Sequence, residues 1–129
     1  MYTYFKYFKI FDINSKISKS FNFIDQPAQN FKKIDNINVS TENAYLYYTK
    51  VSTTNNYIYG LCYEKKRDLM NKHPEKCIPE VHVFNWNGKP IAILKLDQTI
   101  NTFCVVGDTT IFAINPFIDN LIFQYNFKL

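Results

Sequence analysis

Short apolar runs alternate with polar turns along all 129 residues of the chain. The clearest unit is VFNWNGKPIAILKLD, residues 83–97, in which Asn87 and Gly88 separate two apolar runs. An Asn-Gly pair tolerates the positive φ values of a tight turn, so this stretch predicts a β-hairpin with strands at 81–86 and 90–96. The same pattern predicts further strands at 4–13, 18–24, 45–51, 57–63, 102–106, 110–114 and 121–127.

Two longer polar segments interrupt this pattern and are expected to be loops. Residues 25–40 are polar with one proline, and residues 64–79 are charged and include Pro74 and Pro79. Proline cannot donate a ladder hydrogen bond, which argues against a strand in the second segment. Residues 67–72 are expected to form one helical turn at most, since the sequence has no convincing apolar stripe at helical spacing.

The predicted strands recur as a repeat. Residues 7–24 and 81–97 both read apolar strand, Asn-containing turn, Lys and apolar strand, and residues 44–63 likewise resemble 100–117. Four short antiparallel strands per repeat are typical of a β-propeller blade. We therefore expect an all-β fold, a partial β-propeller of about two and a half four-stranded antiparallel blades.

This repeat also predicts how the chain is divided. Residues 1–129 are expected to form a single propeller-like domain. Within it, residues 1–25 are expected to be the outer strands of one blade, 44–97 one full blade, and 98–129 the inner strands of the next.

The hairpin also carries a more specific pattern, V-x-V-F-x-W-x-G-K-P at residues 81–90, followed by a strand that ends in Leu96 and Asp97. Ile100, Ile111 and Ala113 continue the pattern. Together these residues resemble the TolB-like six-bladed propeller proteins common in Bacteroides and its relatives, and the resemblance is better from residue 44 onwards than before it. Other propellers, including NHL-type repeats, use a similar V-x-V-F-D-x-x-G motif.

The resemblance implies a propeller fold within a longer protein that often carries a lipoprotein-type signal. The chain is then expected to be the C-terminal part of such a propeller, which cannot close a ring alone and exposes strand edges. Self-association through these edges is one expected consequence. The expected location is cytoplasmic from this chain alone, because its N-terminus lacks the apolar core of a signal peptide, or the cell envelope if a full-length form carries the lipoprotein signal.

Composition agrees with a folded β protein and narrows the range of partners. Hydrophobic residues make up 47% of the chain and charged residues 20%, and the aromatic share of 18% favours strands. The formal net charge is only +4, and the lysines are scattered, so no nucleic-acid partner is expected. No apolar run approaches the length of a membrane-spanning helix, so no transmembrane segment is expected.

The spacing of cysteine and histidine predicts no metal site, no cofactor and no catalytic residue. Cys62, Cys77 and Cys104 include no CxxC pair, which argues against structural zinc. Cys62 and Cys104 lie in apolar runs and are expected to be buried, whereas Cys77 lies in a polar segment and is expected to be exposed. His82 alternates along a strand and is expected at its surface.

The candidate ligand-binding residues are basic side chains of segment 64–79 and one carboxylate. Lys65, Lys66, Arg67 and His73 could form a basic lip for an anionic ligand or glycan, or simply a solvated insertion. Asp97, at the end of a strand, could be a carboxylate on the ligand face, a metal ligand or a turn cap. The two long loops are expected on one face of the propeller, the usual ligand face.

These expectations favour a non-catalytic binding or protein-interaction module for an unknown protein, peptide or glycan. Two alternatives stay open. One is a propeller enzyme, a hydrolase or lyase, with most of its site in a part of the ring beyond these residues. The other is a cell-surface module that binds glycans or peptides. A cluster of histidines and acids around the propeller axis would favour the enzyme.

Overall fold

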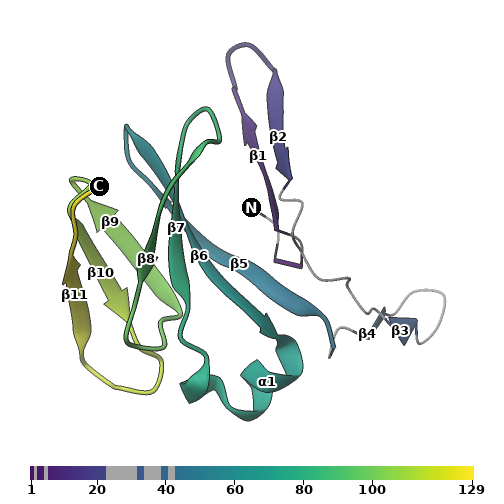
Figure 1. Ribbon diagram of the computed structural model, residues 1–129, viewed down its shortest axis with the longest axis vertical. Coiled ribbons are helices and arrows are strands. Elements are labelled where there is room, and N and C mark those ends of the chain that lie inside the picture. The colour runs from purple at the N-terminus through teal and green to yellow at the C-terminus, as the bar shows by residue number, and fades with distance from the viewer. Residues whose placement is uncertain (2, 5, 23–31, 34–38, 41–42) are drawn as a thin grey trace.

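The computed structural model describes residues 1, 3, 4, 6–22, 32–33, 39–40 and 43–129 (Figure 1). These residues form β-strands, one short α-helix and one 3₁₀ turn, and the sheets have antiparallel neighbours throughout. The expected all-β fold is therefore confirmed. Within the described ranges, no helix is long and apolar enough to cross a membrane.

The central sheet has four antiparallel strands in the order β5-β6-β7-β8. These strands are β5 (Tyr45–Thr53), β6 (Tyr57–Lys66), β7 (Glu80–Asn85) and β8 (Pro90–Lys95). The β7–β8 connection is the hairpin predicted from Asn87 and Gly88. Gly88 has a φ of 78°, and Asn85 Oδ1 accepts hydrogen bonds of 3.0 Å from the backbone N–H groups of Asn87 and Lys89. The turn chemistry of the sequence thus fixes this connection.

Two further sheets are a three-stranded meander in the order β11-β10-β9 and an N-terminal hairpin. The meander consists of β9 (Thr102–Val106), β10 (Thr110–Ile114) and β11 (Ile122–Asn126), and the hairpin of β1 (Tyr7–Phe11) and β2 (Ser18–Asn22). The two-residue strands β3 (Lys32–Lys33) and β4 (Val39–Ser40) pair with each other.

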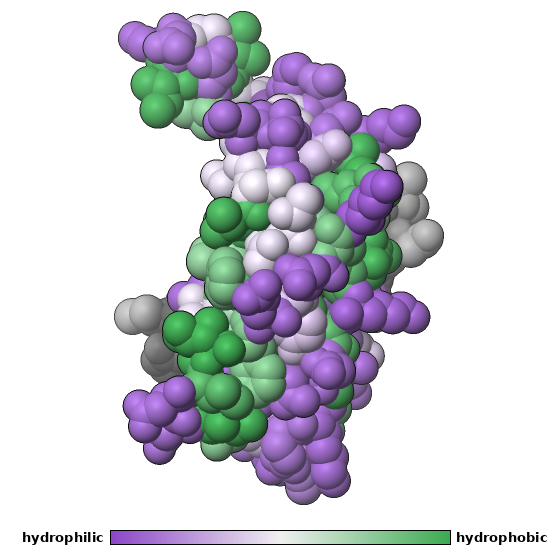
Figure 2. Space-filling model, turned by 90° about the vertical axis from the view of Figure 1, so that its left-hand side faces the viewer, coloured by the Kyte–Doolittle hydropathy of each residue, from purple (hydrophilic) through white to green (hydrophobic). Residues whose placement is uncertain are grey.

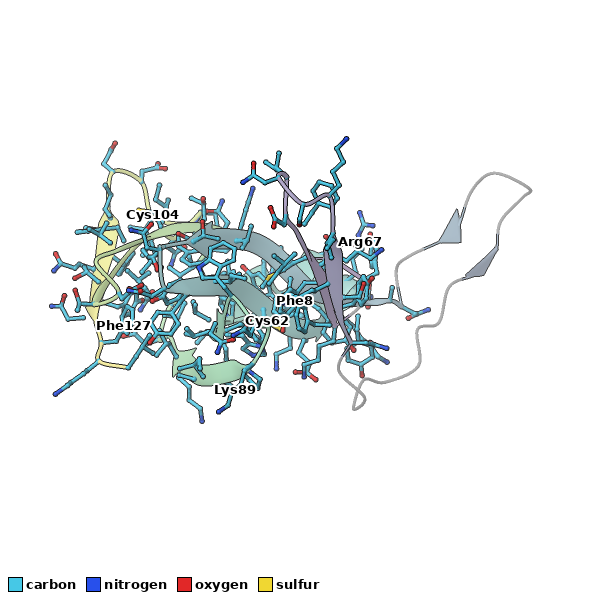
Figure 3. All side chains as sticks on the ribbon, turned by 90° about the horizontal axis from the view of Figure 1, so that it is seen from above. Phe8, Cys62, Arg67, Lys89, Cys104 and Phe127 are labelled. Carbon is cyan, nitrogen blue, oxygen red and sulfur yellow. The ribbon has the colours of Figure 1, made fainter. Side chains whose placement is uncertain are left out.

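The central sheet lies between the meander and the hairpin, as Figure 1 and Figure 3 show from two directions. Side chains alternate along β6, so Tyr59 and Leu61 point to one face and Ile58 and Cys62 to the other. We call the first the meander face and the second the hairpin face. The meander face packs against the inner side of the meander, where the buried residues are Val105, Ile111 and Ala113.

Aromatic packing anchors the N-terminal hairpin on the hairpin face. The Phe8 side chain is 1% exposed, and its ring centroid lies 4.9 Å from that of Phe21 and 4.8 Å from that of Phe84. Phe21 also lies against the β7–β8 turn, because a Cβ added to Gly88 would come within 1.9 Å of its ring. A glycine at this turn is therefore required twice, for its positive φ and for the close approach of Phe21.

The first strands of the central sheet and of the meander lie next to each other. The backbone N–H of Val105 in β9 donates a 3.1 Å hydrogen bond to Ser52 Oγ in β5. In a propeller the first strands of neighbouring blades line the common axis, so this contact fits a partial propeller. The assignment of residues 1–25, 44–97 and 98–129 to three successive blades stays a prediction.

The structure differs from the sequence prediction in the long polar segment. Strand β6 continues to Lys66, and α1 (Arg67–Lys72) and η1 (Pro74–Lys76) follow it. The prediction that Lys65 and Lys66 lie in a loop is wrong, because their backbones pair with Leu46 and Tyr45 of β5. A neighbouring strand supplied by the fold holds these polar residues extended, which local pattern does not reveal.

Strands β3 and β4 lie in the other segment that was expected to be a loop, residues 25–40. The remainder of that segment, residues 25–31 and 34–38, lies outside the described residues. Whether the two long segments share one face of a propeller stays a prediction.

Candidate interaction surface

The structure places the predicted basic residues around the junction of β6 and α1. Lys65 and Lys66 are exposed at the end of β6. Arg67 begins α1, where its Nη1 donates a 2.8 Å hydrogen bond to the Tyr4 hydroxyl and its backbone N–H donates to the Ala44 carbonyl at 2.9 Å. Arg67 thus ties the junction to the N-terminal segment.

His73 and Asp97, the other two predicted residues, lie apart in the fold. His73 follows α1, and its Nδ1 lies 3.7 Å from Oε1 of Glu75. Asp97 follows β8, and its Oδ1 accepts a 2.7 Å hydrogen bond from the Tyr125 hydroxyl of β11. Asp97 therefore links the central sheet to the meander. Ligand binding by the basic residues or by Asp97 stays a prediction.

Asp108 forms a second link between these two sheets, which sequence reasoning missed. It lies in the β9–β10 turn with a φ of 56°, and its carboxylate accepts hydrogen bonds from Thr54 Oγ1 at 2.5 Å, Asn56 Nδ2 at 2.7 Å and the Tyr59 hydroxyl at 2.8 Å. Burial alone would raise the pKa of Asp108, but these three hydrogen bonds outweigh it and lower the pKa. Both acids thus hold neighbouring sheets together.

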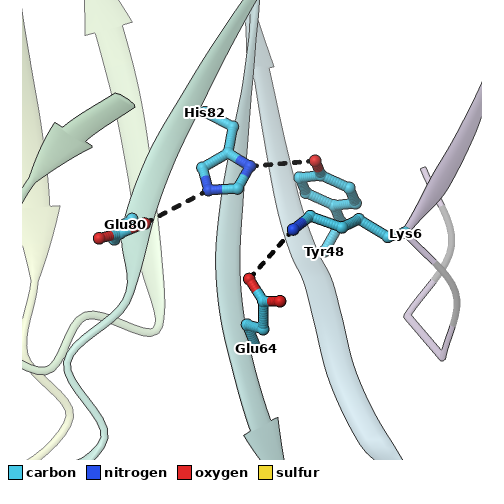
Figure 4. A network of polar contacts seen from close by, with 5 residues as sticks. All are labelled: Lys6, Tyr48, Glu64, Glu80 and His82. Atoms are coloured by element: carbon cyan, nitrogen blue, oxygen red, sulfur yellow. Dashed lines mark hydrogen bonds and ion pairs between the residues drawn. The ribbon is translucent and has the colours of Figure 1, made fainter. Parts of the chain in front are cut away.

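The hairpin face carries a cluster of polar side chains (Figure 4). His82 Nδ1 lies 3.1 Å from the Tyr48 hydroxyl and His82 Nε2 lies 3.5 Å from Oε2 of Glu80. Lys6 Nζ lies 3.1 Å from Oε2 of Glu64. The expectation that His82 lies at the strand surface is wrong, because it is only 7% exposed. The β1–β2 end of the chain packs over this face, which alternation along one strand could not indicate.

The ionisation of this cluster favours a structural role. Burial lowers the pKa of His82, although its hydrogen bond with Glu80 acts in the opposite direction. Burial, together with the charge of Glu64, raises the pKa of the Cys62 thiol to about 12. A protonated thiol is not an activated nucleophile, and the polar contacts described for the imidazole are with Tyr48 and Glu80 rather than with that thiol. Among the described residues, no group of three or more His, Cys, Asp or Glu side chains is placed to hold a metal ion.

An exposed apolar surface lies on the side of the meander that points away from the central sheet, here called the outer face. Its apolar residues are Cys104, Val106, Phe112, Ile114 and Ile122. Val106 is 55%, Ile114 43% and Ile122 64% exposed. Cys104, Phe112, Ile114 and Ile122 line a hollow of about 260 Å³. Figure 2 views the molecule from the meander side and shows apolar patches between polar ones.

Sheet register shows what the outer face corresponds to within the same chain. Strand β6 reads YIYGL at 57–61 and β10 reads TIFAI at 110–114. Ile58 packs against the hairpin and Ile111 against the central sheet. Each of the two side chains thus points towards the sheet that precedes its own in the sequence. Phe112 and Ile114 of β10 therefore occupy the places of Tyr59 and Leu61 of β6.

Strands β7 and β11, which pair with β6 and β10, extend this correspondence. Leu61 pairs with Val81 in β7, and Ile114 pairs with Ile122 in β11. Tyr59, Leu61 and Val81 are 0% exposed because the meander covers them. The outer face is therefore the repeat equivalent of a surface that is buried between two sheets. It differs in having no sheet over it among the described residues.

Comparison with known proteins agrees with this repeat. The family described as TolB-like 6-blade propeller-like matches residues 1–108, so the similarity includes the N-terminal hairpin, where the sequence pattern was weaker. No curated protein and no solved structure matches the chain. The chain belongs to the TolB-like six-bladed propeller family.

Proposed function

We propose that this chain is a non-catalytic protein-interaction module whose binding surface is the outer face of the meander. The observation that carries the proposal is a correspondence between two sets of residues. Half-buried Phe112 and exposed Ile114 and Ile122 match buried Tyr59, Leu61 and Val81. A surface with the residue pattern of an inter-sheet contact is suited to a second sheet. The partner that fits is an antiparallel β-sheet that presents an apolar face.

The energetics favour such a partner over solvent. Each buried aliphatic side chain contributes about 1.5–3 kcal/mol relative to full exposure, and several are clustered here. The apolar residues of the outer face carry no formal charge, so a partner need not desolvate an ion to cover them. The charged Asp108 lies in the adjoining turn and already accepts hydrogen bonds from the central sheet.

The two alternatives receive less support from the described residues. An enzyme would need an activated nucleophile or an accessible acid or base, whereas Cys62 and His82 are buried and in their uncharged forms. A glycan or anion site on segment 64–79 would need available basic groups. Arg67 already donates to Tyr4, and Lys72 Nζ lies 3.1 Å from Oδ2 of Asp68, so such a site would rest on the exposed Lys65 and Lys66.

A photo-crosslinking amino acid at position 122 tests the proposal in cells that express the chain. We expect a discrete adduct from position 122 and none from position 13, an 81% exposed isoleucine in the β1–β2 turn that serves as the matched control. The captured protein, once purified, should bind the chain with a saturating isotherm. Ile114→Glu should weaken that binding at least about tenfold, because it places a charge inside an apolar contact. Equal labelling at both positions, or binding unaffected by Ile114→Glu, would contradict the proposal.

A further inference from the structure

A cleft lies between the β1–β2 hairpin and the β7–β8 turn of the central sheet. The turns of these two hairpins lie at the same end of the molecule (Figure 1). The cleft has a volume of about 370 Å³. Its lining residues are Ile10, Asp12, Ser15, Ile17 and Lys19 from the hairpin and Trp86 from the β7–β8 turn. The two walls therefore come from two sheets that the structure describes.

Strand alternation sets the hairpin wall of the cleft. Ile10 pairs with Lys19, and the backbone N–H of Asp12 donates a 3.0 Å hydrogen bond to the Ile17 carbonyl. Because cross-strand partners share a face and side chains alternate along a strand, these four side chains lie on the same side of the hairpin as Phe8. Phe8 packs against the central sheet. The wall is therefore directed towards that sheet.

Trp86 forms the opposite wall in a fixed orientation. Its Nε1 donates a 3.0 Å hydrogen bond to the Asn55 carbonyl in the β5–β6 turn. Phe21 of the hairpin lies against Gly88, two residues further along the β7–β8 turn, which keeps the two walls side by side. Trp86 is nevertheless 42% exposed, whereas tryptophan is highly buried on average. The indole is thus pre-organised and still accessible to a ligand.

Polar groups of both signs lie across the cleft from this indole. Asp12 Oδ2 accepts a 2.7 Å hydrogen bond from the Ser15 hydroxyl, and Asp12 Oδ1 accepts one of 2.9 Å from the backbone N–H of Asn14. These hydrogen bonds lower the pKa of Asp12, so its exposed carboxylate stays ionised and keeps lone pairs for a ligand. The exposed ammonium of Lys19 supplies donors. The cleft therefore combines an aromatic wall with a hydrogen-bond donor and an acceptor.

This combination selects for a ligand that is uncharged, polar at its edge and apolar on one face. An anion would meet Asp12 and a cation would meet Lys19, whereas a wholly apolar ligand would desolvate both groups without replacing their hydrogen bonds. A pyranose whose hydroxyls are all equatorial has this form. Its axial C–H groups make an apolar face that suits the negative π-face of an indole, and its hydroxyls donate and accept around the rim.

We propose that this cleft binds a pyranose with equatorial hydroxyls, which stacks on Trp86 while its hydroxyls bond to Asp12 and Lys19. The site goes beyond the proposed function, because it lies on the other side of the central sheet from the outer face of the meander. A protein partner at the outer face and a sugar in the cleft are separate, and either can be overturned without the other.

Intrinsic fluorescence tests the proposal directly, because Trp86 is the single tryptophan of the chain. Cellotetraose, a chain of pyranose rings with equatorial hydroxyls, should change the emission in a saturable way. Sorbitol, which has hydroxyls but no ring face, should cause no saturable change. A flat titration with cellotetraose, or an equal response to sorbitol, would overturn the proposal.

Ligand-observed NMR titrations of cellotetraose compare variants without the fluorophore. Trp86→Leu should weaken binding at least about tenfold and Lys19→Ala at least about threefold, whereas Trp86→Phe should retain most of it because an aromatic face remains. Lys95→Ala, at an exposed position of β8 outside the cleft, is the matched control and should bind like the wild type. Ile114→Glu, which alters the outer face, should also leave cellotetraose binding unchanged.

Two results of these titrations would overturn the proposal. One is binding that survives both Trp86→Leu and Lys19→Ala, and the other is an equal loss in Lys95→Ala. Circular dichroism checks that each variant folds, and Lys19→Ala decides the outcome if Trp86→Leu does not fold. The crosslinking experiment at position 122 decides the proposed function separately.

Discussion

Asp108 shows how one residue can hold two sheets in register. Its carboxylate lies in the β9–β10 turn of the meander and accepts three side-chain hydrogen bonds from the central sheet. One donor is the hydroxyl of Tyr59, a residue that is itself fully buried. Hydrogen bonds to a charged acceptor are stronger than those between neutral groups, so this turn is a focal point of the contact between the sheets.

Replacement of Asp108 should destabilise the chain in two steps. Asp108→Asn keeps a side chain that tolerates the positive φ but loses the charge, and should lower the free energy of unfolding by about 1 kcal/mol. Asp108→Ala loses all three hydrogen bonds and strains the backbone, and should lower it by about 2–3 kcal/mol. Urea unfolding at pH 7 measures both. An Asp108→Asn variant as stable as the wild type would show that the carboxylate charge contributes nothing.

The same residue gives a pH dependence with a defined sign. The folded pKa of Asp108 is lowered from 3.8, so its contribution is present above that value and is lost as the pH falls through the folded pKa. The stability difference between the wild type and Asp108→Asn should therefore shrink below about pH 4. A difference that persists unchanged in acid would contradict the hydrogen-bonded carboxylate.

His82 should make the chain less stable in mild acid. Its folded pKa lies below the ordinary 6.5, so the unfolded chain takes up the proton first and stability falls as the pH drops below 6.5. The groups that face His82 or its cluster are Lys6, Tyr48, Cys62, Glu64 and Glu80. Urea unfolding at pH 7.5 and 5.0 should show a loss of about 1 kcal/mol that His82→Gln removes. An equal acid loss in His82→Gln would assign the effect to other groups.

Burial of individual side chains was the least predictable feature of the sequence. Cys104 was expected to be buried and is exposed, and Cys77 was expected to be exposed and is 0% exposed. Cys104 lies in an apolar strand, but on the side that no described sheet covers. Cys77 follows the turn η1, and its Sγ lies 3.5 Å from the His73 carbonyl. Both outcomes depend on neighbours distant in sequence, which a local pattern does not contain.

At the scale of elements, the two turn glycines allow backbone and packing to be separated. Gly88 and Gly107 both have positive φ, 78° and 61°. A Cβ at Gly88 would meet the ring of Phe21 at 1.9 Å, whereas one at Gly107 would meet nothing closer than Thr109 Oγ1 at 3.7 Å. Only the Gly88 turn is therefore in close contact with the N-terminal hairpin.

Gly107→Ala should cost about 1 kcal/mol of unfolding free energy from backbone strain alone. Gly88→Ala should cost at least about 1–2 kcal/mol more, because the methyl group displaces Phe21 and loosens the hairpin. Urea unfolding compares the two, and hydrogen exchange should report faster exchange in β1 and β2 only for Gly88→Ala. Equal costs would show that the hairpin does not pack on this turn.

Elements whose boundaries are set by their own turn residues were predicted well. Elements whose boundaries depend on pairing with a strand distant in the sequence were not. Asn87 and Gly88 carry the turn chemistry of the β7–β8 hairpin, so its strands were placed within a residue or two. The extension of β6 to Lys66 depends on pairing with β5, and polar Lys65 and Lys66 give no sign of it. The proposed interaction surface was missed for the same reason. Its residues look like any other buried strand residues in the sequence, and only the fold of the described residues shows that no sheet lies over them there.

At the scale of the whole molecule, the hairpin, the central sheet and the meander are stacked in sequence order. Each contact joins the face of one sheet that points towards later residues to the face of the next sheet that points towards earlier residues. The central sheet has both faces engaged, fully on the meander side and partly on the hairpin side. Within the part of the chain that the structure describes, the meander packs against another sheet through its inner side alone. The central claim of this account is that, among the described residues, the outer face is open around Cys104, whereas the central sheet is covered around Cys62 and Cys77.

Alkylation of the native cysteines in dilute solution, followed by mass spectrometry, tests this claim most directly. Cys104 lies on the outer face, Cys62 on the hairpin face and Cys77 in the core beside the meander. The account predicts that Cys104 reacts at least about tenfold faster than Cys62 and Cys77, whose pKa values burial raises. Cys62 reacting as fast as Cys104, or Cys104 protected at the lowest concentration, would contradict it.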